Sequence, residues 1–166
     1  MKLLVAFIVG LIAAPLLFAL AGILGWLPSD ASSMPPKWEM AVGMRALDTS
    51  LEKRSDGLKN PIAANDSAAL AAGMKIYGDS CASCHGNASA PSTWGTRGLY
   101  PRAPQFWQEG SDVTPVEAYA AIRDGVRYSG MGAWRDLMKQ DDMWKVANFV
   151  ARIQDLPPQL RQQAKR

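Results

Sequence analysis

The chain has 166 residues, of which 48% are hydrophobic and 20% charged, and its formal net charge is +3. This length suits one globular domain with additional segments. The small positive excess is mixed evenly with Asp and Glu, which argues against a nucleic-acid-binding protein. Cysteine and histidine are scarce: two cysteines and one histidine lie within five positions, and this limits the chemistry open to the chain.

The N-terminus carries a long apolar segment. Directly after Lys2, the uncharged run continues from Leu3 to Leu27. About 20 such residues span the hydrocarbon core of a bilayer as a helix, and Pro15 is tolerated inside a membrane helix. We therefore expect residues 1–27 to form a transmembrane anchor.

A secretory signal that is cleaved is the alternative, because Ala19-Leu20-Ala21 gives a small-x-small cleavage pattern. The apolar run continues past this site and exceeds the usual signal core of about 7 to 15 residues, which favours a retained anchor. Both alternatives export the remaining chain. Lys2 precedes the run and Asp30 follows it, so the positive-inside rule predicts a cytoplasmic N-terminus. The expected location is the bacterial inner membrane, with a single pass and the following domain in the periplasm.

Residues 28–66 are expected to join the anchor to the next domain. Within this spacer the helical spacing of apolar residues predicts an amphipathic helix at residues 37–54. The residues that define its apolar face are Met40, Met44, Leu47 and Leu51. Two interpretations of this helix are equally supported: it docks on a membrane surface or partner subunit, or it packs on the chain's own domain. Residues 55–66 favour a loop.

The compact domain is expected at residues 67–160, followed by a polar tail at residues 161–166. No credible pair of strands is present, so the fold class is all-α. A run of helix-forming residues opens the domain, with Asn65 or Asp66 as its N-cap.

Two further helices are predicted after a long, glycine- and proline-rich loop between Gly86 and Asp112. A capping box at Thr114–Glu117, with proline at the first helical position, starts the second helix, which should stop at Gly125. Asp141 should cap the third helix, which should end before the proline pair that begins at Pro157. A loop of this length is uncommon in so small a domain, and it is understandable if it surrounds a group that is not protein.

Residues 81–85 carry the strongest chemical signal. Cys81-Ala82-Ser83-Cys84-His85 has the C-x-x-C-H pattern of covalent haem attachment. Two thiols three positions apart on a helical turn suit thioether bonds to the two vinyl groups of one porphyrin, and the adjacent imidazole suits the iron. We therefore predict one covalent haem c, attached through Cys81 and Cys84, with His85 as an axial iron ligand.

The cysteine pair has three other interpretations. A thioredoxin-like redox motif requires a β-sheet, for which the sequence gives no sign. A structural zinc site needs four nitrogen or sulfur ligands, and the chain offers three candidates. A simple disulfide is compatible with an exported protein. Haem attachment is favoured over all three.

The second axial ligand cannot be another histidine of this chain, because His85 is the only one. Methionine is the usual partner in c-type cytochromes, and Met131, Met138 and Met143 lie downstream. Met131 lies between two glycines, which allow the backbone to approach a flat ring closely. Met138 and Met143 fit better as packing residues, so Met131 is the predicted ligand. Without it, a five-coordinate iron would bind small gases or peroxide.

Three features carry a resemblance to a known family. A glycine, an aromatic residue and the first haem cysteine follow one another at intervals of four: Gly73, Tyr77 and Cys81. An aliphatic and an aromatic residue recur in the last helix: Val146 and Phe149. The loop Gly125–Met131 ends at the predicted second ligand. In these features the chain from about residue 67 to residue 158 resembles class I cytochrome c.

The resemblance implies a cytochrome c-like haem domain of three to four helices after the transmembrane helix. It also implies that a loop proline carbonyl accepts a hydrogen bond from the ligating imidazole, and both Pro101 and Pro104 are candidates. Arg102 and Arg127 are candidates to pair with the haem propionates, and ordinary surface arginines are the equally supported alternative. Aromatic residues that could line the porphyrin, or simply pack in the core, are Trp94, Trp107, Tyr128 and Trp134.

The expected function is outer-sphere electron transfer, with no bond-making catalysis and no small-molecule substrate. The expected partners are the membrane, through the N-terminal helix, and redox proteins, with the chain either free-standing or a subunit of a larger complex. A peroxidase-like or gas-binding haem protein is the enzyme-class alternative, and an anchored thiol oxidoreductase is the alternative without haem. The sequence identifies neither the electron donor nor the acceptor.

Overall fold

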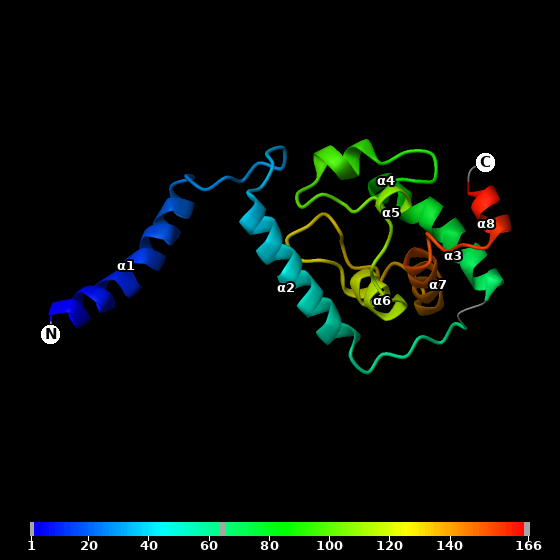
Figure 1. Cartoon of the computed structure of the whole chain (residues 1–166), viewed down its shortest axis with the longest axis horizontal. Coiled ribbons are helices and arrows are strands. Elements are labelled where there is room, and N and C mark those ends of the chain that lie inside the picture. The colour runs from blue at the N-terminus through cyan, green and yellow to red at the C-terminus, as the bar shows by residue number, and fades with distance from the viewer. Residues whose placement is uncertain (1, 64–65, 165–166) are drawn as a thin grey trace. The chain divides into compact units, whose positions relative to one another are not determined.

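A computed structural model describes residues 2–63 and 66–164, and every regular element in these ranges is helical (Figure 1). The all-α prediction is therefore confirmed for the described residues. The chain divides into two units, the first ending at Asp30 and the second beginning at Ala31. The second unit contains the helix predicted within the spacer as well as the helices predicted for the compact domain.

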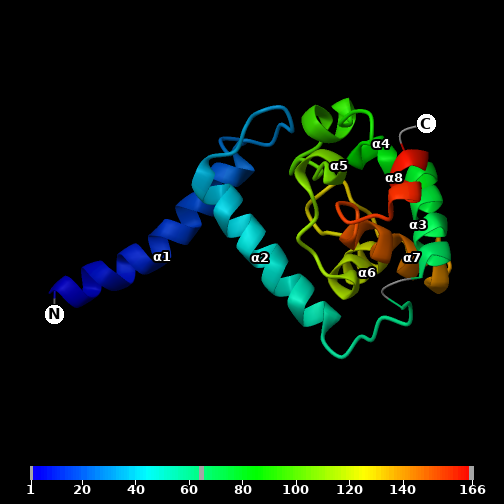
Figure 2. The same cartoon turned by 45° about the vertical axis from the view of Figure 1, so that its right-hand side comes forward.

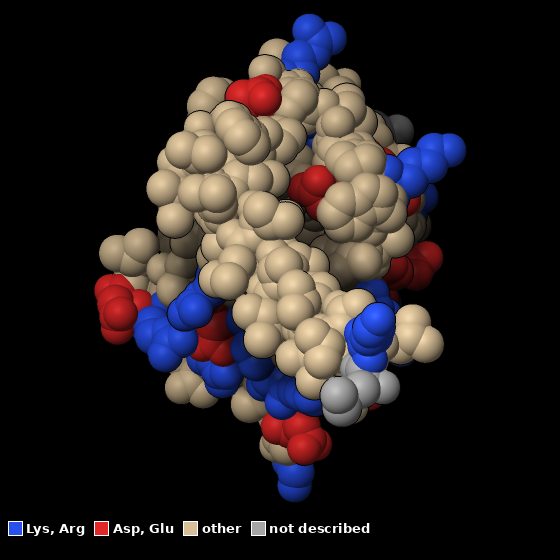
Figure 3. All heavy atoms as spheres, turned by 90° about the vertical axis from the view of Figure 1, so that its left-hand side faces the viewer, with Lys and Arg blue, Asp and Glu red and all other residues tan. Residues whose placement is uncertain are grey.

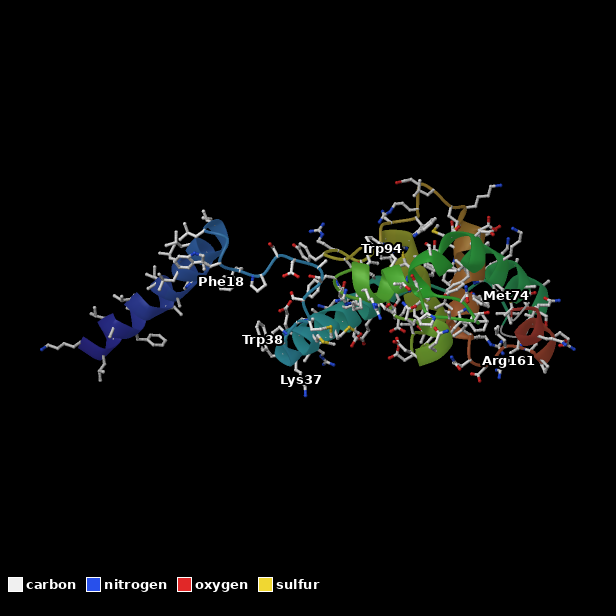
Figure 4. All side chains as sticks on the ribbon, turned by 90° about the horizontal axis from the view of Figure 1, so that it is seen from above. Phe18, Lys37, Trp38, Met74, Trp94 and Arg161 are labelled. Carbon is white, nitrogen blue, oxygen red and sulfur yellow. The ribbon has the colours of Figure 1, made fainter. Side chains whose placement is uncertain are left out.

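The first unit is built on α1, Lys2–Ile23, which is long and apolar enough to cross a membrane, with a mean hydropathy of 2.8. None of its residues is buried against protein. Phe18, labelled in Figure 4, is 65% exposed. A helix that is apolar on every side suits lipid as its surroundings. The predicted span of residues 1–27 extends beyond the helix, and Met1 lies outside the described residues.

In the second unit, the predicted spacer helix is α2, Lys37–Ser55. Its C-terminal half packs on the chain's own domain: Leu51 is 6% exposed, and the Nη1 atom of Arg54 donates to the carbonyl of Gly125 at 3.0 Å. Figures 1 and 2 show α2 running beside α6, Pro115–Asp124. The N-terminal half is mostly exposed: Trp38, labelled in Figure 4, is 68% exposed, while the carboxylate of Glu39 accepts a hydrogen bond from the hydroxyl of Tyr100.

The loop after α2 is tied to the core by a pair of amides. Asn60 and Asn148 exchange two hydrogen bonds of 2.8 and 3.0 Å, each Nδ2 donating to the other residue's Oδ1. Asn148 is only 3% exposed, and its Nδ2 also donates to the carbonyl of Trp144. Buried polar groups are costly unless they are paired, so this exchange fixes the loop to the domain.

The core is centred on the crossing of α3, Ser67–Ser80, and α7, Gln140–Ala151. The backbones approach closely at Gly73, where an added Cβ would lie 2.2 Å from the carbonyl oxygen of Lys145. Beside this point Tyr77 packs on Phe149, with ring centroids 5.3 Å apart. Only a glycine allows the two helices to come this close, and the packing of Tyr77 on Phe149 stabilises the crossing.

Local signals set several of the helix ends. The side chain of Asp66 accepts a hydrogen bond from the backbone of Ala69 at 2.8 Å, which confirms one of the two predicted caps of α3; Asn65 lies outside the described residues. The capping box between Thr114 and Glu117 is present at the start of α6, as predicted. At its other end α6 stops at Gly125.

Two predictions, the cap of the last predicted helix and the absence of helix from the long loop, were wrong. Helix α7 begins at Gln140 after Lys139, with no side-chain cap; it ends at Ala151, before the proline pair, as predicted. Asp141 lies inside the first turn, where an acidic side chain complements the helix dipole. A further short helix, α8, Pro158–Gln163, joins the end of the predicted domain to the start of the polar tail, because proline suits the first turn of a helix and Leu160, 7% exposed, joins the core.

The loop predicted between Gly86 and Asp112 holds two short helical segments, a π-helical turn at Trp94–Gly98 and α5 at Phe106–Glu109. Neither segment has an apolar periodicity long enough to be read from sequence.

Charges on the surface are mixed: in the lower part of the face drawn in Figure 3, basic and acidic side chains lie next to one another.

The crossing at Gly73 yields a stability prediction with an internal control. We expect Gly73→Ala to lower the free energy of unfolding by about 2 to 3 kcal/mol, because the new methyl group overlaps backbone atoms of α7. Gly78 lies in the same helix with nothing within 4 Å of an added Cβ. Gly78→Ala should therefore stabilise the chain by up to about 1 kcal/mol. Denaturant unfolding followed by tryptophan fluorescence measures both, and equal effects would contradict this account of the crossing.

Asp124, at the end of α6, is surrounded by three arginines and is 14% exposed. Its carboxylate accepts hydrogen bonds from Arg123, at 2.7 Å, and from Arg135, and it lies 4.0 Å from Arg54. The hydrogen bond from Arg123 is the main cause that holds the pKa of Asp124 below its usual value, with the charges of the three arginines acting in the same direction against the effect of burial.

A depressed pKa in the folded state means that the stabilisation is present above the unfolded pKa, about 3.9, and is lost as the pH falls through the folded value. We therefore expect Asp124→Asn to cost about 1.5 kcal/mol near neutral pH and progressively less below about pH 4. Asp79→Asn is the matched control, because Asp79 pairs with Lys75 on an exposed surface. Unfolding at a series of pH values tests this, and parallel curves for both variants would argue against the arginine cluster.

Candidate functional site

The cysteine motif lies at the break between two helices. Helix α3 ends at Ser80, and α4, Ala82–His85, follows directly. The amide of Cys81 donates to the carbonyl of Tyr77 at 2.9 Å, and the amide of His85 donates to the carbonyl of Cys81 at 2.9 Å. The two thiols and the imidazole therefore come from one turn of backbone that the core helix α3 positions.

Both cysteines have free, half-buried thiols. Burial, together with the neighbouring Cys84, raises the pKa of Cys81 to about 11. Thiol–disulfide enzymes depend on a thiol whose pKa is lowered. The surroundings of Cys81 thus speak against the thiol oxidoreductase alternative.

The imidazole of His85 is held on two sides. Its Nδ1 lies 2.9 Å from the carbonyl oxygen of Pro104, and since that oxygen can only accept, Nδ1 is the donor. The ring of Phe106 stacks on the imidazole, with centroids 4.9 Å apart and planes at 15°. Burial lowers the pKa of His85 against the opposing effect of the Pro104 hydrogen bond. The result is a neutral imidazole with Nε2 left over to bind a metal.

The two candidate prolines of this loop are thereby distinguished by position. Pro104 contacts the imidazole through its carbonyl. Pro101 is exposed and follows a cis peptide bond from Tyr100. The sequence alone had left the choice open, because both prolines lie in the same short stretch.

The loop that carries Met131 is closed on itself. It begins at Gly125, whose φ of +71° suits glycine. The amide of Val126 donates to the carbonyl of Met131 at 3.0 Å, and the hydroxyl of Ser129 bridges the carbonyl of Val126 and the amide of Met131. Met131 itself is half-buried against the core. These bonds give the methionine a defined backbone position.

The other two downstream methionines pack in the core, as predicted. Met143 is 3% exposed within α7, and Met138 is half-buried against the same hydrophobic cluster.

Arg102 is occupied by backbone carbonyls. Its guanidinium donates to four of them, in the segment before α2 and in its own loop: Ala31, Ser32, Arg97 and Leu99. Arg127 is exposed. The structure therefore gives Arg102 a part in fixing the loop and leaves Arg127 in solvent, while the pairing of either with propionates stays a prediction.

The aromatic candidates differ in burial. Trp107 and Trp134 are half-buried against the core, and Trp107 packs on Phe149 with centroids 5.8 Å apart. Trp94, labelled in Figure 4, is 61% exposed on the π-helical turn. Tyr128 is 88% exposed and has a positive φ of 61°.

Sequence reasoning missed two residues of this site, Gln105 and Phe106. Gln105 is 2% exposed, and its side chain contacts the backbone of Cys84. No local pattern marks either residue, since both act through contacts to a segment about twenty positions earlier in the chain. Their position after a proline was the only available signal.

The residues present suit a covalent haem. Two free thiols are available for thioether bonds, an imidazole nitrogen and a thioether sulfur are the axial donors of many c-type cytochromes, and Nδ1 of His85 already has its partner. Among residues 2–63 and 66–164, no group of three or more His, Cys, Asp or Glu side chains is arranged to hold a metal ion. The zinc alternative therefore finds no ligand set there.

Comparison with known proteins agrees with this chemistry. Residues 68–150, half of the chain, match the family described as cytochrome c oxidase, cbb3-type, subunit III. No curated protein and no solved structure gives a significant match. The matched range contains most of α3, the cysteine motif, the Met131 loop and most of α7. The chain therefore belongs to the family of cytochrome c oxidase, cbb3-type, subunit III, and its helical domain is a cytochrome c domain for a covalent haem c.

Proposed function

We propose that this chain is a membrane-anchored electron carrier with a single haem c whose axial ligands are His85 and Met131. The observation that carries the proposal is the orientation of His85, whose Nδ1 is fixed by Pro104 and whose Nε2 is left for iron. The closed loop around Met131 supports a thioether as the second donor.

The haem, when bound, supplies one-electron chemistry. Cys81 and Cys84 would hold it covalently, and His85 and Met131 would bind its iron, so that no substrate could reach the metal. Pro104 and Phe106 restrict the rotation of the imidazole. What remains for the protein is to set the reduction potential and to limit the contact of the site with water.

The anchor confines this chemistry to the membrane. We propose that α1 is retained rather than cleaved, with the N-terminus in the cytoplasm and the haem domain in the periplasm of a bacterium. A tether raises the effective concentration of the domain near other membrane proteins. The family is described as an oxidase subunit, which supports a role within a membrane-bound redox complex, with redox proteins as direct partners.

The ligand assignment is tested by Met131→Ala. We expect haem to remain attached, the weak far-red band of the ferric methionine–iron bond to disappear and the reduction potential to fall, because methionine ligation raises it. Optical spectra and a redox titration of the protein purified from its native host measure these changes.

Met138→Ala is the control, since Met138 is half-buried and packs against the core. It should keep the band and the potential. Loss of the band in Met138→Ala, or its survival in Met131→Ala, would reassign the ligand. If the wild type lacks the far-red band and its ferrous form binds carbon monoxide, the five-coordinate alternative is favoured.

Covalent attachment is tested separately by Cys84→Ser. We expect this variant to lose most of its haem, because one of two thioether bonds cannot form. Peroxidase-type staining of a denaturing gel reports only haem that is covalently bound, and the wild-type band should stain. A colourless wild-type band from the native host would overturn the haem proposal, whereas full staining of Cys84→Ser would exclude Cys84 from attachment.

A further inference from the structure

The side-chain amide of Gln105 is buried beside the haem motif. It is 2% exposed. Its Oε1 accepts a hydrogen bond from the amide of Ser92 at 2.7 Å, and its Nε2 donates to the carbonyls of Cys84 at 3.0 Å and Ala103 at 2.8 Å. Both donor hydrogens and the acceptor are therefore used, as a buried amide requires.

Two glycines make room for this amide. A Cβ on Gly86 would lie 2.8 Å from Oε1 of Gln105, and a Cβ on Gly95 would lie 3.0 Å from its Nε2 and 1.8 Å from the carbonyl oxygen of Cys84. The backbone of the haem motif and the backbone of the π-helical turn therefore enclose the amide at a distance that side chains would prevent.

The residues on either side of Gln105 are the ones that contact the imidazole of His85. Pro104 accepts the hydrogen bond from Nδ1, and Phe106 stacks on the ring. The side chain of Gln105 meanwhile holds the carbonyl of Cys84, the peptide group that leads into His85. One amide thus joins the segment that carries the ligand to the segment that orients it. In Figures 1 and 2 the two short helices involved, α4 and α5, lie next to each other.

The backbone of Gln105 is fixed as well. Its carbonyl accepts hydrogen bonds from the amides of Gln108 and Glu109, at 3.0 and 2.9 Å, and its own amide donates to the carboxylate of Glu109 at 3.0 Å. These bonds start α5 and set the direction in which Phe106 leaves the chain. The side chain and the backbone of Gln105 therefore both help to fix the two residues that contact the imidazole.

We propose that Gln105 is a positioning residue for the axial ligand, which acts on the haem iron through His85 and lowers the reduction potential. This inference rests on the proposed ligation by His85. A hydrogen bond from Nδ1 to a carbonyl makes the imidazole a stronger donor, which favours ferric iron. If the amide of Gln105 is removed, the Pro104 carbonyl loses its anchor, the hydrogen bond weakens and the potential rises.

The test replaces Gln105 by Leu, which has a similar volume and no hydrogen-bonding groups, in the full chain produced with haem in the native host. Three measurements are made: haem staining for attachment, a redox titration, and the exchange rate of the Nδ1 proton of His85 by NMR. We expect retained haem, an upward shift of the potential and faster proton exchange. The last two readouts would not move if Gln105 only filled space.

Gln108→Leu is the matched control, because Gln108 lies in the adjacent helix α5 and its exposed side-chain amide donates to the carbonyl of Asn87 at 2.9 Å. It should leave the potential and the proton exchange unchanged. A wild-type potential with unchanged exchange in Gln105→Leu overturns the proposal, as does an equal shift in Gln108→Leu. If Gln105→Leu yields no haem-loaded protein, Gln105→Asn, which shortens the side chain but keeps an amide, is read by the same criteria. Absence of haem from the wild type would instead overturn the proposed function.

Discussion

The close approach of α3 and α7 at Gly73 is the constraint on which the haem motif depends. The carbonyl of Lys145 occupies the space that a side chain at position 73 would need, so the two helices can cross this closely only where α3 has a glycine. Helix α3 then delivers Cys81 to a fixed place at its end, and the hydroxyl of Tyr77 reaches from the crossing to the carbonyl of His85 at 3.0 Å. One helix, α3, thus contributes both to the packing of the core and to the position of the haem motif.

The parts of this arrangement that could be predicted are those written in short stretches of sequence. The cysteine motif, the capping box at Thr114 and the stop at Gly125 each depend on residues within a few positions of one another. The parts that escaped prediction depend on pairs far apart in the chain. Asn60 and Asn148 are 88 positions apart, and nothing near either residue indicates the other.

The dependence on distant residues also explains why the loop of the site could be predicted only in part. Its length and its glycines predicted that it surrounds a group other than protein, but not which proline faces the imidazole. That choice depends on the three-way hydrogen bonding of Gln105, which draws the neighbouring Pro104 against the haem motif. A single buried glutamine between two loops belongs to no periodic pattern of apolar residues. Glutamine is also a residue type that is usually exposed, so nothing in the sequence indicates that this one is buried.

Both predicted axial ligands are therefore held by segments outside the helix that carries the cysteines. The loop before α5 orients His85, and α2 fastens the start of the Met131 loop through the hydrogen bond from Arg54 to Gly125. An electron carrier benefits from ligands whose geometry is fixed by surrounding contacts, because a loosely held ligand must rearrange with each change in oxidation state. Since α2 follows the membrane segment in the chain, the part of the protein nearest in sequence to its anchor also supports the methionine side of the site.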